Sequence, residues 1–489
     1  MQGTAGQWGR RWRGVAVGSL ALLVLPVPAL PANDAGPALG RVEQAWRGDL
    51  DGMIKRRLIR ALVVYSKTFY FIDRGAPHGT SYDTLTAFEN FLNRKLKRRH
   101  LRVHVVFIPV SRDELLPSLV QGRGDIAAAN LTITPEREKV VDFSHPFWTG
   151  ISEVLVTGPA APALRSVEDL SGRKILVRAS SSYYEHLKRL NRRLAKERKP
   201  PVKLELAPEH LEDEDLLEMV NAGLIPYIVV DSHKARFWAK VLKHIKVHDT
   251  IAVNRGGRIA WAFRHHSPEL KAAINEFVRH ARKGTLFGNT TFAKYLESTK
   301  WVRDATSKRA MARFERTVAL FKKYAKRYDF DWLMLAAQGY QESRLNQNRK
   351  SPSGAIGVMQ VMPSTGRAMN VGDIHKLEPN IHAGVKYMRT MLTRYFHAAK
   401  LDPLNRNLFA FAAYNAGPTR IASLRRIAAK EGLNPNVWFG NVERVAAAKI
   451  GRETVQYVSN IYKYYVAYRL ARDEREQRER AREQLRNSY

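Results

Sequence analysis

The pattern of the chain changes once, near Ser298, and this change divides it into two folded parts. Before Ser298, short runs rich in Val and Ile alternate with helical stretches, which predicts an α/β domain at residues 59–298. After it, almost every segment repeats its apolar residues at helical spacing, which predicts an all-α domain at residues 305–470. A chain of 489 residues is also too long for one ordinary core. We therefore expect a multidomain protein.

The α/β part should hold strands separated by helices, and this alternation predicts largely parallel sheets, because parallel strands need crossover helices. The strands are expected at residues 60–66, 102–110, 124–133, 153–158, 174–179, 225–231 and 258–263. The helices of the second part are expected at residues 305–328, 331–344, 381–400, 407–415 and 454–470. Residues 471–489 mix both charges almost without interruption, so we expect a solvated helical tail.

The N-terminus has the three regions of a secretory signal peptide. Arg10, Arg11 and Arg13 form a basic region, an apolar stretch follows, and Ala32 offers a small residue for cleavage. The apolar stretch is short and broken by proline, which favours export over an uncleaved anchor. We expect residues 1–32 to be a signal peptide that directs the protein to the periplasm. Residues 33–58 are expected to be a linker that ends in a short helix.

The net charge narrows the class of partner. With 81 Lys and Arg against 46 Asp and Glu, the chain carries a formal charge of +35, which favours polyanions. Export makes nucleic acid a poor candidate, so we expect contact with anionic envelope surfaces, including the outer membrane, and no nucleic acid. The chain has no cysteine, so it is not expected to be a lipoprotein or to form disulfides. No metal or cofactor motif occurs, and no cofactor is expected.

The run GDIAAANLTITPEREKVVDFSHPF, residues 124–147, resembles the first lobe of family 3 periplasmic solute-binding proteins. The resemblance covers residues 59–298 and implies two α/β lobes that close on a ligand around a hinge. The aromatic run from Tyr65 to Phe71 departs from the family's pattern, so the ligand stays open. A small amino acid or a muropeptide is the ligand that this resemblance suggests.

The same resemblance assigns five residues to ligand binding. Arg137 would bind a ligand carboxylate, which a guanidinium group can grip with two hydrogen bonds, and Thr132 would add a hydroxyl. Ser181 and Ser182 would lie at a helix N-terminus that favours an anion. Asp231 would hold a ligand ammonium. Two alternatives stay open: Arg137 could balance neighbouring glutamates at a surface, and Asp231 could cap the helix that follows it.

Glu342 ends an apolar helical pattern that begins at Trp332. At about 100° per residue, Leu335, Gly339 and Glu342 share one stripe, so Glu342 is expected at a buried edge. Loss of hydration raises the pKa of a carboxyl group above its usual value of roughly 4.3. A carboxylic acid that is still protonated near neutral pH suits a general acid in glycosidic cleavage.

Five motifs in order, between residues 320 and 468, resemble the soluble-lytic-transglycosylase family. They are Glu342-Ser343, Gly357-Val358-Met359-Gln360, Asn380-Ile381, Ala413-Tyr414-Asn415-Ala416-Gly417, and Glu453-Thr454 with Tyr457. The resemblance implies an all-α, goose-lysozyme-like domain that cleaves peptidoglycan between N-acetylmuramic acid and N-acetylglucosamine. Cleavage in this family is not hydrolytic and leaves 1,6-anhydro ends.

By this resemblance Glu342 acts first as acid and then as base, while the sugar's own 6-hydroxyl attacks C1. Such a reaction needs no second carboxylate, unlike ordinary glycoside hydrolysis. Ser343 and Gln360 would orient the sugars, and Tyr414, Asn415 and Tyr457 would line the cleft. The sequence thus predicts an exported murein lyase whose solute-binding domain regulates it. The alternatives are an exported glycan- or solute-binding protein without lytic activity, and a lysozyme-type hydrolase.

Overall fold

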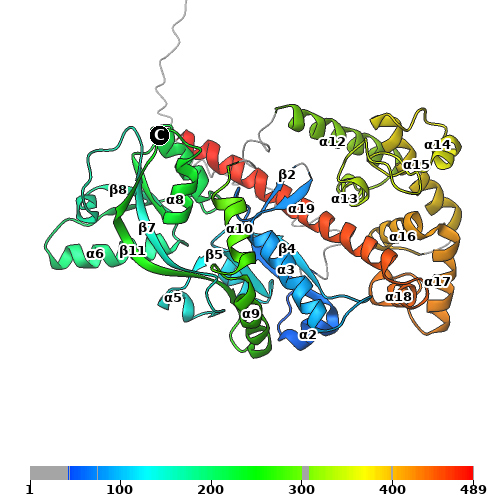
Figure 1. Ribbon diagram of the computed structural model, residues 1–489, viewed down its shortest axis with the longest axis horizontal. Coiled ribbons are helices and arrows are strands. Elements are labelled where there is room, and N and C mark those ends of the chain that lie inside the picture. Colours follow the sequence, from blue (N-terminus) through cyan, green and yellow to red (C-terminus); the bar gives the residue numbers. More distant parts are fainter. Residues whose placement is uncertain (1–41, 43, 74, 300–307, 398–399, 488–489) are drawn as a thin grey trace, which may run out of the picture.

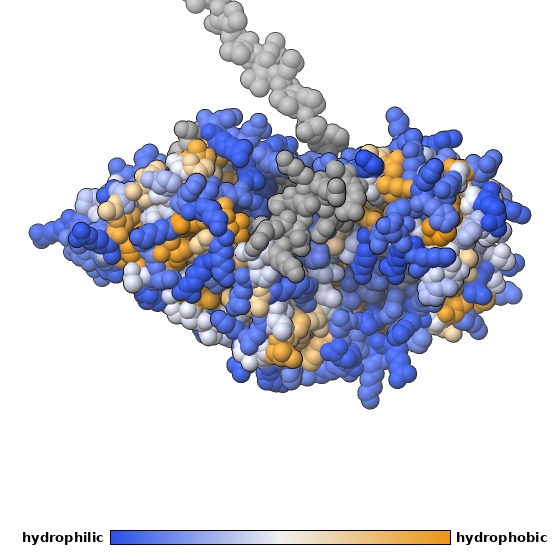
Figure 2. All heavy atoms as spheres, turned by 45° about the horizontal axis from the view of Figure 1, so that its top comes forward, coloured by the Kyte–Doolittle hydropathy of each residue, from blue (hydrophilic) through white to orange (hydrophobic). Residues whose placement is uncertain are grey.

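The α/β part and the helical part lie next to each other along the long axis of the molecule (Figure 1). This computed structural model describes residue 42 and residues 44–73, 75–299, 308–397 and 400–487. The predicted signal peptide lies outside the described residues. The face drawn in Figure 2 is mostly hydrophilic, and its hydrophobic atoms form separate small patches.

The first lobe of the α/β part is built on three parallel strands. Its elements are α2 (Leu50–Arg56), β1 (Leu58–Val63), β2 (Phe71–Asp73), β3 (Ala76–His78), α3 (Thr80–Lys95), β4 (His104–Pro109), α4 (Leu115–Val120), β5 (Ile126–Thr132), α5 (Pro135–Glu138), β6 (Asp142–Phe143), α9 (Pro268–Ala281) and α10 (Leu286–Leu296). β1 lies between β4 and β5, with Ala61 opposite both Phe107 and Ile126. Alternate residues of β1 fill the cores on the two sides of the sheet: Ala61 packs under α3 and α9, and Leu62 under α4.

The second lobe is joined to the first by two long strands. Its elements are β7 (Trp148–Thr157), the 3-10 helix Val167–Leu170, β8 (Lys174–Val177), α6 (Ser182–Lys196), β9 (Lys203–Leu206), α7 (Asp213–Asn221), β10 (Tyr227–Asp231), α8 (Ser232–Ala239) and β11 (Lys246–Phe263). The main sheet has the order β10-β7-β11-β5-β1-β4, and β6 pairs with β11. The pairs β10–β7, β7–β11 and β11–β5 are antiparallel. The prediction of largely parallel sheets is therefore wrong, because β7 and β11 carry the chain between the lobes in opposite directions.

The second domain is all-helical, as predicted. Its elements are α12 (Lys308–Tyr328), α13 (Trp332–Ser343), α14 (Pro363–Met369), α15 (Leu377–Tyr395), α16 (Pro403–Ala416), α17 (Pro418–Lys430), the π-helix Trp438–Val442, α18 (Glu443–Lys449) and α19 (Arg452–Arg486). Most residues of α13 are buried, so this helix runs through the middle of the domain. Val106 of β4 belongs to the same apolar core, which joins the domain to the first lobe. No helix in the described ranges combines the length and the apolar content needed to span a membrane.

The charged tail is helical, as predicted, but only one of its faces is solvated, because the other is docked on the α/β domain. It forms the second half of α19, which crosses the whole molecule and ends beside the second lobe (Figure 1). There the buried side chain of Arg478 pairs with Asp215 at 2.7 Å and Glu214 at 3.0 Å, both on α7. Leu485 and Ala481 join the apolar core of that lobe. The physical reason is complementarity: a basic helix face meets the acidic first turn of α7.

The segment expected to be a linker is partly docked on the first lobe. α2 is the short helix expected there, and its residues Leu50 and Met53 are buried in the core of the first lobe. The buried side chain of Arg60 donates hydrogen bonds to the carbonyl oxygens of Gln44 and Trp46. The folded α/β part therefore extends before residue 59, where the domain was expected to begin.

Candidate active site and the cleft of the α/β domain

Glu342 lies in the last turn of α13, at the edge of the helical core. The helix begins at an N-cap bond from Leu333 to Asp331 and ends at Arg344, whose backbone is left-handed with φ of 59°. Leu335, on the same stripe as Glu342, is fully buried, as the helical spacing predicted. Burial raises the pKa of Glu342 to about 7, against the opposing effects of a hydrogen bond from Tyr457 and the charge of Arg349. This carboxyl group therefore holds its proton at a higher pH than an exposed glutamate does.

Tyr457 is the hydrogen-bond partner of Glu342. Its hydroxyl donates to Oε1 of Glu342 over 2.5 Å and accepts a bond of 3.3 Å from Nε2 of Gln338. Burial and the negative charge of Glu342 raise the pKa of Tyr457 well above its ordinary value, so the hydroxyl keeps its proton. Because Gln338 and Glu342 are on α13 and Tyr457 is on α19, this chain of hydrogen bonds fixes the two helices to each other.

The segment from Ile356 to Val361 forms a tight loop beside Glu342, and its backbone is held by two neighbouring helices. Asn380 of α15 is fully buried, accepts a bond from the backbone of Met359 at 2.9 Å and donates to Ile356 at 2.8 Å. Tyr414 of α16 donates its hydroxyl to the carbonyl of Met359 at 2.7 Å. Gly357 has φ of 79°, and a Cβ there would lie 2.5 Å from Asn380. The glycine of the second motif thus serves the backbone.

Ser343, Gln360 and Asn415 lie around this loop and have partners within the protein. Ser343 is buried and donates to Val358 at 2.9 Å, so it ties the end of α13 to the loop. Gln360 is half-buried and donates to Gly357 at 2.8 Å. Asn415 accepts a bond of 2.6 Å from Thr454 of the last motif. The five motifs therefore meet in one place, although Ser343 turns its hydroxyl toward the backbone.

Sequence reasoning missed Gln338, Arg349 and the structural role of Asn380. Gln338 is the polar residue one turn before Glu342 on an otherwise apolar helix, and a buried amide there implies a partner. That signal could have found it. Nothing in the local pattern points to Arg349, since it comes from the loop and bears on Glu342 only through the fold.

The first lobe reaches the segment that follows Glu342. A cleft of about 1540 Å³ separates the β2–β3 hairpin from the end of α13. Asp73 and His78 of the hairpin line one side, and Arg344 and Asn346 line the other. The two domains therefore share a cleft at the end of α13.

The five residues predicted to bind a ligand in the α/β domain are all buried. Arg137 donates to the carbonyl of Thr132 at 2.9 Å. Ser181 caps α6, and Ser182 donates to Glu153 at 2.7 Å. Asp231 makes no side-chain cap bond to α8, so the capping alternative is not supported. The surface alternative for Arg137 is not supported either, because only 7% of its surface is exposed.

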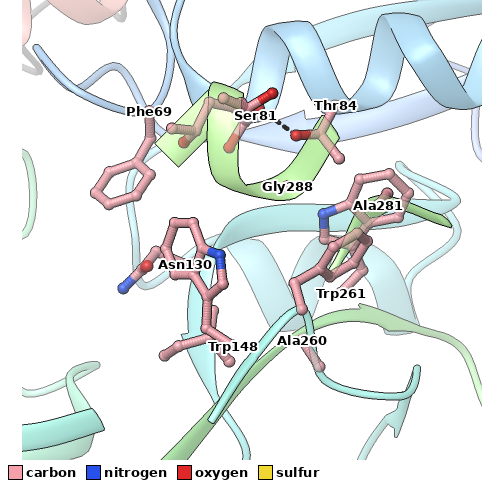
Figure 3. A pocket seen from close by; sticks show the side chains of 13 residues that line it. Phe69, Ser81, Thr84, Asn130, Trp148, Ala260, Trp261, Ala281 and Gly288 are labelled. Atoms are coloured by element: carbon pink, nitrogen blue, oxygen red, sulfur yellow. Dashed lines mark hydrogen bonds between the residues drawn. The ribbon is translucent and has the colours of Figure 1, made fainter. Parts of the chain in front are cut away.

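A small aromatic pocket lies beside these residues. In Figure 3 the rings of Phe69, Trp148 and Trp261 surround its space, with Asn130 between the first two. Ser81 and Thr84 of α3 lie at its upper side in that view, and the Thr84 hydroxyl donates to the carbonyl of Thr80 at 2.7 Å. The lining side chains carry no charge.

Comparison with known proteins gives two family matches. Residues 319–435 match the family of the Transglycosylase SLT domain, and residues 62–296 match bacterial extracellular solute-binding proteins, family 3. The SLT match ends before Tyr457, so the partner of Glu342 lies outside it.

Individual proteins match most of the chain. The membrane-bound lytic murein transglycosylase F of Desulfosudis oleivorans is 29% identical over 441 residues, which are 86% of this chain and 92% of that protein. That of Shewanella pealeana is 29% identical over 427 residues, which are 82% of this chain and 83% of that protein. Among solved structures, an ancestral arginine-binding protein bound to arginine is 24% identical with a TM-score of 0.41, and it covers 49% of this chain and 98% of that chain.

Proposed function

We propose that this chain is a lytic murein transglycosylase F-like enzyme, with a family 3 solute-binding domain ahead of a Transglycosylase SLT domain, and that Glu342 is its catalytic acid. Its substrate is peptidoglycan, cleaved between N-acetylmuramic acid and N-acetylglucosamine. The observation that carries the proposal is the state of one carboxyl group: burial raises the pKa of Glu342 to about 7, and Tyr457 holds it in place.

The reaction uses one carboxyl group twice, and two different protons pass through it. Protonated Glu342 gives its proton to the glycosidic oxygen while positive charge develops at C1 of the muramic acid. The carboxylate then takes the proton of that sugar's 6-hydroxyl, whose oxygen bonds to C1. The product carries a 1,6-anhydro ring, and Glu342 is protonated again for the next turnover.

The surroundings of Glu342 support this route over hydrolysis by two carboxylates. Among the described residues, the groups that interact most with its carboxyl are Tyr457, Tyr414 and Arg349, and none of these is a carboxylate. Hydrolysis with retention or inversion requires a second carboxylate at a defined separation. An attacking hydroxyl within the substrate removes that need and gains from proximity.

The groups near the loop are proposed to bind the sugars. Gln360 and Asn415 are half-buried polar residues at the same place as Glu342, and they suit the N-acetyl and hydroxyl groups of the glycan. Tyr414 lies there too, but its hydroxyl donates to the carbonyl of Met359 and holds the loop. Tyr457 positions the acid. Ser343 acts by fixing the end of α13, because its hydroxyl is used by the backbone.

Digestion of purified murein tests the proposal. The wild-type chain should clear a murein suspension and release fragments that mass spectrometry finds lighter by one water than hydrolytic products. Glu342→Gln should lose this activity by at least about 100-fold. Glu431→Gln changes an exposed glutamate just after the end of α17 and serves as the matched control.

Two outcomes would contradict the proposal. Fragments with free reducing ends would identify a lysozyme-type hydrolase. Murein binding without release of fragments would identify a glycan-binding protein.

The setting and the role of the first domain are also proposed. The net charge of +35 and the names of the relatives favour an exported protein held at envelope surfaces in the periplasm. The α/β domain would regulate access to the shared cleft through a small ligand. Regulation of this kind requires that the ligand bind two arrangements of the domain with different affinity.

A further inference from the structure

We infer that the cleft of the α/β domain is closed by the chain's own charges. Glu185 stands where a ligand carboxylate would meet Arg137, and Lys234 stands where a ligand ammonium would meet Asp231. The domain therefore does not bind a free α-amino acid. This inference rests on the regulatory role proposed above and narrows its ligand, but it does not depend on the activity of Glu342.

The first half of the inference concerns Arg137, which comes from the first lobe. Its Nε lies 3.3 Å from Oε1 of Glu185 on α6 of the second lobe. Its two other nitrogens donate to the carbonyls of Thr132 at 2.9 Å and Ser180 at 2.8 Å. The guanidinium group thus already has a carboxylate partner and two carbonyl partners, and the second lobe supplies two of the three.

The second half concerns Asp231. The ammonium of Lys234 lies 3.0 Å from Oδ2 of Asp231 and 2.7 Å from Oδ2 of Asp213. It also lies over the ring of Phe69, 5.3 Å from its centre, and Phe69 belongs to the first lobe. A carboxylate and an aromatic face are the groups that recognise an amino-acid ammonium. The side-chain ammonium of Lys234 already occupies this position beside Asp231 and Phe69.

Lys234 is charged in this position. Only 3% of its surface is exposed, and burial alone would lower the pKa of its amine. Asp213 and Asp231 outweigh that effect and raise the pKa of Lys234 above its usual value. A buried ion pair with further hydrogen bonds is costly to open, because removal of one partner leaves the other buried and unpaired.

Further bonds hold the two lobes against each other around this network. Arg112 of the first lobe binds Glu212 of the second through two nitrogens, at 2.9 and 2.6 Å. Asn130 of the first lobe donates to Asp231 at 2.9 Å. Arg478 of α19 donates to the carbonyl of Tyr65 in the first lobe at 2.8 Å while it pairs with α7. A free amino acid would have to replace several such contacts at once.

The pocket beside these ion pairs has no charged side chains that could bind the ammonium and carboxylate of an amino acid. It is the aromatic pocket of Figure 3, whose lining residues carry no charged side chain. Glu185 already engages Arg137, and Lys234 already engages Oδ2 of Asp231, while Oδ1 of Asp231 has no hydrogen-bond partner among the described residues.

Binding to the full chain tests the inference without any substitution. Equilibrium dialysis against labelled arginine, glutamate and alanine should show no saturable binding up to about 1 mM. A saturable site for any of them below that concentration would overturn the inference. Murein digestion is measured separately, so failure of this inference is distinct from failure of the proposed activity.

Two variants test whether the ammonium of Lys234 and the carboxylate of Glu185 occupy the positions that a ligand would take beside Asp231 and Arg137. Lys234→Ala should melt at least about 5 °C lower than wild type, and ethylammonium chloride should restore part of the loss saturably. Tetramethylammonium chloride at the same ionic strength should not. Lys139→Ala, at an exposed lysine paired with Glu136, is the matched control and should respond to neither salt.

Glu185→Gln gives an independent measurement in case Lys234→Ala fails to fold, since Glu185 is a quarter exposed. Propionate should raise the melting temperature of Glu185→Gln saturably and leave that of the wild type unchanged. If propionate has no effect on Glu185→Gln, or ethylammonium none on folded Lys234→Ala, the tethered groups do not occupy ligand positions and the inference is wrong.

Discussion

The hydroxyl of Tyr457 lies 2.5 Å from Oε1 of Glu342 and joins the last helix of the chain to the acid at the end of α13. The residues are 115 positions apart, and both are largely shielded from water. Burial raises the pKa of the carboxyl, and the bond from Tyr457 partly opposes this effect while it holds the carboxyl in position.

We predict that activity falls as pH rises through about 7. The acid must be protonated to cleave, and burial raises the pKa of Glu342 to about 7. The pH profile of kcat/KM on a soluble murein fragment measures the pKa of the free enzyme. A profile that stays flat up to pH 9 would contradict Glu342 as the proton donor.

Tyr457→Phe should move this fall in activity to higher pH. A hydrogen bond donated to the carboxylate favours its charged form, so loss of the bond raises the pKa of Glu342, by about one unit. The maximal rate at low pH should decrease as well, because Gln338 loses its partner and the carboxyl is less well held. Tyr395→Phe, at an exposed tyrosine of α15, is the control. A shift to lower pH would show that the hydroxyl does not stabilise the carboxylate.

Glu342→Gln should make the protein more stable, and the gain should grow with pH. The folded pKa of about 7 lies above the ordinary value of 4.5, so the folded state binds this proton more tightly than the unfolded chain. That contribution is fully present below pH 4.5 and is lost as pH rises through 7. The amide does not ionise, so its advantage at pH 8 over pH 4 should be at most about 3 kcal/mol. Urea unfolding of both proteins at the two pH values measures it.

Gly357→Ala should cost about 2 kcal/mol or more of stability and most of the activity. Its φ is 79°, and the new methyl group would meet Asn380 at 2.5 Å. Gly417→Ala separates the effect of the positive φ from that of the contact with Asn380. Its φ is 90°, but nothing lies within 4 Å of the added carbon. A cost at Gly357 no larger than that at Gly417 would show that the contact with Asn380 is unimportant.

Arg478→Ala should destabilise the protein by about 3 kcal/mol, because it leaves Asp215 and Glu214 buried without their partner. Arg480→Ala, two residues further along the same helix, removes the same charge from an exposed position and should cost less than about 0.5 kcal/mol. Chemical unfolding of the two variants and the wild type measures these differences in the free energy of unfolding. Equal costs would mean that the tail is not docked in solution.

Local patterns predicted what depends on local order. The change near Ser298, the helix that ends at Glu342 and the raised pKa of that residue all follow from spacing within one or two turns. The pairing of strands could not be predicted in the same way, because β7 and β11 form an antiparallel link between lobes that strand–helix alternation does not reveal.

The missed contacts join residues that are far apart in sequence. Arg478 and Asp215 are separated by 263 positions, and an arginine in a charged run looks alike whether it faces water or an acidic helix. Lys234 and Asp231 are close in sequence, yet their meeting with Phe69 depends on closure of two lobes. The sequence predicted a site at Arg137 and Asp231, but it did not show that Glu185 and Lys234 of the same chain pair with them.

The docking of α19 has a consequence for how this protein can be divided. The second lobe precedes the catalytic helices in sequence, yet Arg478, Ala481 and Leu485, which complete its packing, follow them. A fragment cut between residues 299 and 308 would leave this lobe with an uncovered apolar patch and a row of uncompensated acids. The order of the two domains along the sequence suggests two separable modules, but the docking of α19 makes them a single interlocked body.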